Sequence, residues 1–100
     1  NLVYTSGQIG VDPATGVAPE GLEAQAHQVF KNLCELLKAA GSDISKVVKT
    51  TVFIKNMDDF ALVNSIYGQY FTEPYPARSC VEVARLPKDL LVECEVIAEL

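Results

Sequence analysis

The stretch LLVECEVIAEL, from Leu90 to Leu100, decides the fold class because it alternates more clearly than any other segment of the chain. One alternate set is apolar and consists of Leu90, Val92, Cys94, Val96, Ala98 and Leu100. The other set mixes glutamates with two apolar residues and consists of Leu91, Glu93, Glu95, Ile97 and Glu99. Successive side chains of a strand point to opposite faces. The segment therefore predicts a strand with one core face and one mixed face, and the mixed face suits a surface between subunits.

Two other segments follow a helical period instead. Between Gly21 and Ala40 the apolar residues recur three and four positions apart, at Leu22, Ala26, Val29, Phe30, Leu33, Leu36 and Leu37. A second stripe consists of Phe60, Val63, Tyr67, Tyr70 and Phe71. Both patterns predict amphipathic helices. Gly41 is placed to end the first helix in the left-handed conformation, and Asp58 or Asp59 is placed to cap the second.

The remaining segments predict further strands. Leu2–Ile9 alternates weakly, and the Asp-Pro and Gly of Val11–Gly16 predict a hairpin turn after it. Val47–Lys55 is rich in β-branched residues. Two prolines in Thr72–Pro76 end the second helix, and Arg78–Ala84 is predicted as the next strand. The order ββαβαββ predicts an α+β fold with a mixed sheet and two helices packed on one face.

Size and composition exclude several classes of protein. One hundred residues predict a single domain. The net charge of −5 and the scattered basic residues argue against a nucleic-acid-binding surface. No apolar stretch reaches the roughly 18 residues of a membrane span. The chain starts abruptly at Asn1, so we expect a further segment to precede it.

The cysteines predict neither a metal site nor a disulfide framework. Cys34, Cys80 and Cys94 form no CxxC pair, and a lone His27 cannot complete a zinc site. We therefore expect reduced thiols in a cytoplasmic protein, with no metal. Cys80 with His27 as a cysteine nucleophile and its base is an unfavoured alternative, because no motif joins them.

Arg78 is the candidate with the clearest chemistry. It opens a strand directly after the proline-rich break, so its guanidinium is held at a strand edge on a stiffened approach. Arginine binds a carboxylate through two parallel hydrogen bonds. The alternative is an ordinary surface salt bridge to one of the many acidic residues.

The stretch around Arg78 also resembles the signature of a known family. Pro76-Ala77-Arg78-Ser79-Cys80, followed by Val83-Ala84-Arg85-Leu86-Pro87 and the Glu-x-Glu strand, is similar to the signature of the RidA (YjgF) family. Further similarities occur in order at Thr5–Ile9, at Ala39–Gly41 with Val47–Val52, and at Asp59–Tyr67, so the resemblance covers essentially the whole chain. It implies a single RidA-like domain over residues 1–100, with a chorismate-mutase-like fold. It also implies a homotrimer whose sites lie between subunits.

The resemblance implies roles for six residues. Arg78 would bind the substrate carboxylate, the backbone of Cys80 would hold the imine end, and Glu93 would position and activate water. Ser6, Gly7 and Asn64 would line the pocket. Each has an alternative: Glu93 as a solvated strand residue, Asn64 as a local hydrogen-bonding residue, and Ser6 with Gly7 as a strand bulge. Tyr67, Tyr70 and Phe71 are expected in the core or an interface rather than in a stacking platform.

The implied activity is hydrolysis of reactive 2-imino acids. The substrates would be 2-aminoacrylate, its tautomer 2-iminopropionate, and 2-iminobutyrate, released by pyridoxal-phosphate enzymes that act on serine or threonine. An iminium carbon is already electrophilic, so a held water and a proton acceptor suffice and no cofactor is expected. The products would be 2-keto acids and ammonia, and the role would be detoxification of metabolites. Alternatives are a module that binds 2-oxobutyrate-like carboxylates without turnover, and an endoribonuclease or translation inhibitor, which the acidic charge disfavours.

Two departures from the family pattern affect the pocket. Members usually carry an N-terminal segment that supplies an aromatic wall, and we expect that segment to precede Asn1. The connection Glu73–Pro76 is shorter than in many relatives, which predicts a reshaped pocket rim.

Overall fold

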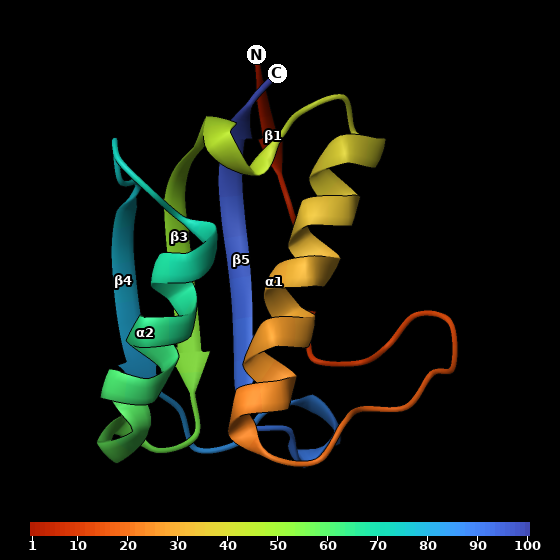
Figure 1. Cartoon of the computed structure of the whole chain (residues 1–100), viewed down its shortest axis with the longest axis vertical. Coiled ribbons are helices and arrows are strands. Elements are labelled where there is room, and N and C mark those ends of the chain that lie inside the picture. The colour runs from red at the N-terminus through yellow and green to blue at the C-terminus, as the bar shows by residue number, and fades with distance from the viewer.

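The computed structural model describes all residues from 1 to 100 and confirms an α+β fold (Figure 1). The elements are β1 (Leu2–Tyr4), β2 (Gln8–Ile9), α1 (Leu22–Ala39), β3 (Val47–Ile54), α2 (Phe60–Tyr70), β4 (Ala77–Glu82) and β5 (Val92–Glu99). Short 3₁₀ turns occupy Ile44–Lys46, Met57–Asp59 and Pro87–Asp89. Both helices lie on the same side of one mixed sheet, as the sequence predicts (Figure 1).

The sheet has the strand order β1-β5-β3-β4, and β2 also pairs with β5. The long central strand β5 is antiparallel to β1, β2 and β3. The pairing of β3 with β4 is parallel, and α2 connects these two strands. Consequently β4 is an edge strand, and β3 separates it from β5.

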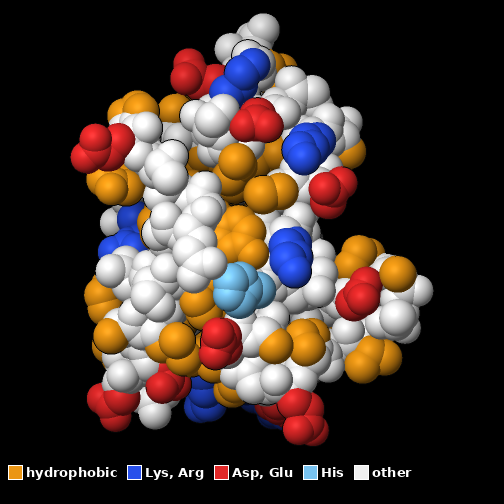
Figure 2. Space-filling view, viewed as in Figure 1, with side chains coloured by type: hydrophobic (Ala, Val, Ile, Leu, Met, Phe, Trp, Pro, Cys, Tyr) orange, Lys and Arg blue, Asp and Glu red, His pale blue; other side chains and the backbone are white.

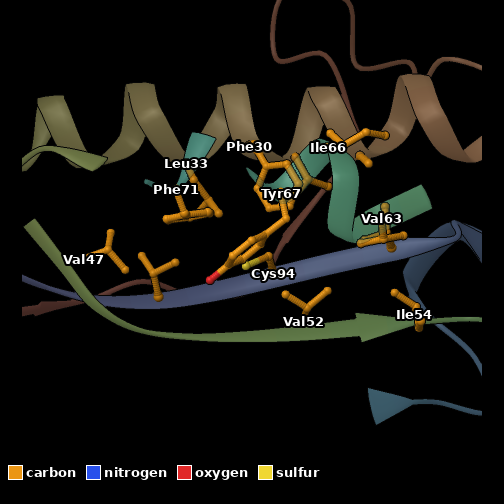
Figure 3. Packing of buried hydrophobic residues seen from close by; sticks show 14 of the residues in the cluster. Phe30, Leu33, Val47, Val52, Ile54, Val63, Ile66, Tyr67, Phe71 and Cys94 are labelled. Carbon is orange, nitrogen blue, oxygen red and sulfur yellow. The ribbon is translucent and has the colours of Figure 1, made fainter. Parts of the chain in front are cut away.

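The core lies between the helices and the sheet (Figure 3). On β5 the predicted apolar set Val92, Cys94, Val96 and Ala98 is buried, which confirms the alternation. Phe30 of α1 is fully buried, and its ring meets the rings of Tyr67 and Phe71 edge-on. Leu36, which was placed on the apolar stripe, is instead 37% exposed.

The predicted turn after the first strand forms, but no ladder of paired strands extends from it. The segment Leu2–Ile9 is split into β1 and β2, and the residues from 11 to 17 form a turn closed by a single bridge between Asp12 and Val17. The side chain of Asn32 on α1 donates hydrogen bonds to the carbonyls of Ile9 and Val11. These bonds tie the chain to the helix, so it does not continue as a paired strand.

The helix ends follow the prediction at one place and depart from it at another. Gly41 has φ +85°, the left-handed conformation expected after the end of α1. Asp59 occupies the N-cap position of α2, but its side chain makes no capping hydrogen bond. The side chain of Asn56 instead caps the preceding 3₁₀ turn by accepting a hydrogen bond from the Asp58 N–H. A 3₁₀ turn precedes α2, so the free N–H groups that need a cap belong to that turn.

The face of the sheet away from the helices is mixed in character. Glu93 and Ile97 of β5 are half-buried there, and Tyr4 of β1 is 70% exposed. This face, which we call the open face, carries no helix (Figure 1). All three cysteines are free, and neither helix combines the length and apolar character that a membrane crossing requires.

Candidate active site

Arg78 lies on the helix side of the sheet, at its edge. It is the second residue of β4, and it pairs in parallel register with Thr50 of β3. Thr50 is fully buried and shares a hydrogen bond with Tyr67 of α2, so this register position faces the helices. The side chain of Arg78 therefore projects beneath α2.

The guanidinium of Arg78 is held by neutral groups. Its Cζ atom lies 4.6 Å from the ring centroid of Tyr67 and 5.3 Å from that of Phe60. Its Nη1 atom donates a 2.6 Å hydrogen bond to Oδ1 of Asn64. Cation–π stacking and a short hydrogen bond to an amide orient the group but leave its charge uncompensated.

No carboxylate of the chain neutralises Arg78. The single ion pair in the structure joins Arg85 to Asp89, with Nε and Oδ1 2.6 Å apart. The alternative of an ordinary surface salt bridge from Arg78 is thus not what the structure shows. An exposed guanidinium without a counter-ion in the chain is free to bind an anion.

Arg78 borders a hollow of about 420 Å³. Its lining residues are Asn64, Tyr67, Gly68, Phe71, Tyr75, Pro76 and Arg78. Arg78 is the only charged residue among them, and most of the others offer aromatic or apolar surface. The volume is in the range of small-molecule sites. The hollow can hold a small organic anion with its negative end against Arg78.

The thiol and the backbone of Cys80 differ in where they lie. Burial raises the pKa of the thiol, although the nearby charge of Arg78 opposes the shift. The side chain is half-buried against the core, and His27 is hydrogen-bonded to Tyr70, so no cysteine–histidine pair forms. In a parallel ladder, alternate residues direct their backbone groups toward the same neighbour. The N–H of Val83 donates to the carbonyl of Ile54 on β3, so the set of alternate residues that includes Val83 faces β3. Cys80 lies three residues earlier and belongs to the other set, so its backbone groups point to the free edge.

Glu93 lies on the open face, beside Gly7. In the sheet it is opposite Phe53 on one side and Ile9 on the other. A Cβ atom added to Gly7 would lie 2.7 Å from Cδ of Glu93, so only glycine allows this close approach. The pKa of Glu93 is raised, first by burial and second by the neighbouring charge of Glu95. A carboxylate with a raised pKa and no hydrogen-bonding partner in the chain is suited to accept a proton.

Ser6 and Gly7 occupy the break between β1 and β2, just before the residue Ile9 that pairs with Glu93. The carbonyl of Ser6 accepts a hydrogen bond from the side-chain amide of Gln8. The two residues therefore interrupt the strand. The contact of Gly7 with Glu93 gives the same residues a place beside a candidate base.

Five of the six predicted residues thus form two groups on opposite faces of the sheet, and the sixth, Ser6, directly precedes Gly7 in the break between β1 and β2. Arg78, Cys80 and Asn64 lie on the helix side at the β4 edge. Glu93 and Gly7 lie at the open face. Within one chain the structure does not bring the two groups together.

Sequence reasoning missed the platform under Arg78. Tyr67 is 6% exposed and belongs to the core, as predicted, but its ring also stacks against the guanidinium of Arg78. Phe60 was predicted only as part of the apolar stripe. The spacing of Phe60, Asn64 and Tyr67 places them on one face of a helix, and this pattern was the available signal.

Comparison with known proteins places this site in a family. The family model described as "Endoribonuclease L-PSP" matches residues 1–100. A 2-iminobutanoate/2-iminopropanoate deaminase from Salmonella typhimurium is 54% identical over 101 residues, which cover 98% of this chain and 79% of the relative. The protein of the same name from Escherichia coli is 52% identical, with the same coverage.

Solved structures agree with the sequence comparisons. RidA from the Antarctic bacterium Psychrobacter sp. PAMC 21119 superposes with a TM-score of 0.97 at 46% identity, covering 100% of this chain and 81% of the other. The YjgF gene product of E. coli gives a TM-score of 0.92 at 51% identity, covering 98% of this chain and 80% of the other. The family model matches all of residues 1–100, and the two deaminases are 52–54% identical to the chain, so the chain belongs to the endoribonuclease L-PSP family, also known as the YjgF/RidA family.

Proposed function

We propose that this protein is a hydrolytic deaminase that converts small 2-imino acids to 2-keto acids and ammonia. Its substrates are 2-iminopropanoate, with its tautomer 2-aminoacrylate, and 2-iminobutanoate. The observation that carries the proposal is the uncompensated guanidinium of Arg78 at the border of a small hollow. The names of relatives that are 52–54% identical support the same reaction.

Arg78 binds the substrate carboxylate in this proposal. The planar guanidinium offers parallel donors, so it fixes both the position and the plane of the carboxylate. The backbone of Cys80, two residues along the same strand, faces the free edge and binds the nitrogen end. Holding the substrate at two points supplies the orientation that water addition to the imine carbon requires.

Glu93 is the proposed base. Glu93 accepts a proton from water as the water oxygen bonds to the carbon of the protonated imine, which gives a neutral carbinolamine. Glu93 returns this proton to the nitrogen and then takes the hydroxyl proton as the C–N bond breaks, which releases the 2-keto acid and ammonia. The raised pKa of Glu93 makes it a stronger base than an ordinary carboxylate. Gly7 leaves space beside the carboxylate, and Ser6 and Asn64 complete the proposed pocket lining.

A homotrimer with sites between subunits completes the proposal. Arg78 and Glu93 lie on opposite faces of one sheet, so a site that uses both needs Arg78 from one subunit and Glu93 from a neighbour. The open face, with exposed Tyr4 and Val81 among half-buried residues, provides apolar surface for such an assembly. We further propose that residues 1–100 form one domain, since both helices share one core with the sheet.

The proposed cellular role is removal of reactive enamines and imines in the cytoplasm. Pyridoxal-phosphate enzymes that eliminate water from serine or threonine release such species. The three free cysteines fit a reducing compartment.

The test is a coupled assay in which a threonine dehydratase generates the imine and the release of ammonia and 2-oxobutyrate is followed. The protein should accelerate product release, and Arg78→Ala should lower kcat/KM about 100-fold or more, because it removes a charge-assisted pair of hydrogen bonds. Arg85→Ala is the matched control, since Arg85 is exposed and paired with Asp89. Full activity of Arg78→Ala would contradict the proposed role.

A second candidate function is binding of small carboxylates without turnover. It is favoured by the division of the site, because one chain alone presents only the carboxylate-binding group. A similar structure, described as E. coli TdcF with bound serine, is 46% identical with a TM-score of 0.93. Tight binding of 2-oxobutyrate with no change in the lifetime of the imine would support this function over catalysis.

An endoribonuclease activity, named in the description of the family model, is disfavoured. The net charge is −5, and Figure 2 shows acidic and basic side chains interspersed over the helix face. Nucleic-acid binding requires clustered positive charge. RNA cleavage that purified protein performs and Arg78→Ala loses would reverse this judgement.

A further inference from the structure

The guanidinium of Arg78 rests in a cradle formed by one face of α2. Phe60, Asn64 and Tyr67 are spaced by four and three residues, so their side chains follow one another along the helix. Two of them offer ring faces to the guanidinium, at 5.3 and 4.6 Å, and the third accepts its 2.6 Å hydrogen bond. The cradle fixes the group from two sides without neutralising it.

Tyr67 is itself held firmly in place. Its hydroxyl shares a 2.9 Å hydrogen bond with Oγ1 of Thr50, a fully buried residue. Its ring stacks on Phe71 with centroids 4.5 Å apart and meets Phe30 edge-on. Figure 3 shows the Tyr67 side chain reaching from α2 into the layer between helices and sheet. The ring therefore has little freedom to turn away from Arg78.

The position of Thr50 links this hydrogen bond to Arg78. Thr50 is the register partner of Arg78 in the β3–β4 pair, so the strand that carries Arg78 and the residue that fixes Tyr67 are adjacent. A buried hydroxyl in a core requires a partner, and here that partner is the tyrosine beneath the guanidinium. Thr50, Tyr67 and Arg78 form one connected unit.

We infer that Tyr67, fixed by Thr50, is a positioning residue that holds the Arg78 guanidinium in its carboxylate-binding orientation. The inference rests on the proposed function of Arg78 as the carboxylate anchor. An arginine side chain has several rotatable bonds, and ordering them upon ligand binding weakens affinity. The cradle orders them beforehand, so the carboxylate binds to a group that is already oriented.

The experiment compares two ligands that differ in charge. Dissociation constants are measured by calorimetry for 2-oxobutyrate and for the uncharged 2-oxobutanamide. The ratio of the amide's dissociation constant to that of 2-oxobutyrate reports the contribution of Arg78 to carboxylate recognition. Tyr67→Leu should lower this ratio about tenfold. Tyr67→Phe, which keeps the ring, should retain most of it, and Thr50→Val should lower it about twofold.

Two matched variants serve as references. Tyr70→Leu removes a tyrosine of the same helix that contacts His27 instead of Arg78, and it should leave the ratio unchanged. Phe60→Leu removes the second ring of the cradle. Because Phe60 is only partly buried, this variant should fold even if Tyr67→Leu does not. It should lower the ratio about threefold.

The outcomes separate this inference from the proposed function. If Arg78→Ala leaves the ratio unchanged, Arg78 is not the carboxylate anchor and the proposed function is overturned. If Arg78→Ala abolishes the preference while Tyr67→Leu and Phe60→Leu keep it, only the positioning inference fails. Equal weakening of both ligands by Tyr67→Leu and Phe60→Leu would also overturn it, because a purely structural defect does not distinguish ligands by charge.

Discussion

The side chains of Arg78 and Glu93 project from opposite faces of one sheet, on strands that β3 separates. Arg78 of β4 pairs with Thr50 of β3, and Thr50 pairs in turn with Val96 of β5. Glu93 precedes Val96 by three residues on β5. A site that uses both groups must therefore combine two chains. This geometric relationship leads directly to the first prediction.

Mixing two inactive variants should restore activity. In the proposed trimer, each site would take Arg78 from one chain and Glu93 from the next. Arg78→Ala and Glu93→Gln chains, refolded together in equal amounts, should regain about one quarter of the wild-type sites, the chance that the intact residues meet. Deaminase activity after co-refolding is the measurement. If the refolded trimers contain both variants and still show no activity, Arg78 and Glu93 do not act together in one shared site.

The pH dependence of the reaction should respond to Glu95. Its negative charge contributes to the raised pKa of Glu93, after burial. Removing that charge in Glu95→Gln lowers the pKa of Glu93, so the basic carboxylate persists to lower pH. The acid limb of the profile of kcat/KM against pH should therefore move to lower pH. Glu99→Gln, further along the same strand face, is the control and should leave the limb in place.

Gly7→Ala should reduce activity more than stability. The new Cβ would lie 2.7 Å from Cδ of Glu93, and the flexible carboxylate would move aside. A displacement of about 1 Å in a reacting group can lower the rate about 100-fold. Gly10→Ala provides the contrast, because its Cβ would meet the backbone carbonyl of Gln25 at 2.7 Å, which cannot move so easily. Thermal unfolding should show the larger loss of stability for Gly10→Ala.

Phe30→Ala should be among the most destabilising single substitutions. Phe30 is fully buried, and its ring contacts Tyr67, Tyr70 and Phe71. Truncating such a residue typically lowers the free energy of unfolding by about 3–5 kcal/mol. Urea unfolding followed by circular dichroism measures the change. Leu36→Ala on the same helix, at a partly exposed position, should lower it by less than half as much.

The parts of the fold that the sequence predicts well are those in which local pattern and burial coincide. The alternation of Leu90–Leu100 distinguishes two unlike faces, and β5 occupies that segment with the expected side buried. The strand containing Arg78 follows a proline-rich break, which fixes its beginning. The helix of Gly21–Ala40 is recognisable because its apolar stripe runs over several turns.

The errors arise where a partner distant in the sequence decides the outcome. The predicted hairpin is reduced to a turn with one bridge, and Asn32, far along the chain, donates hydrogen bonds to the carbonyls of Ile9 and Val11. The separation of Arg78 from Glu93 depends on β3 lying between β4 and β5, although β4 and β5 are consecutive in the sequence. The second role of Tyr67 depends on which helix face meets the sheet edge. Periodicity alone contains none of this information.

The neutral surroundings of Arg78 have a practical consequence for measurements on this protein. A ligand that approaches the guanidinium displaces no carboxylate of the protein, because Tyr67, Phe60 and Asn64 carry no charge. Buffer anions such as acetate or phosphate meet the same open position and compete for it. Apparent affinities will therefore vary with the composition of the buffer, and solutions of large, weakly coordinating anions will give values nearest to the intrinsic one.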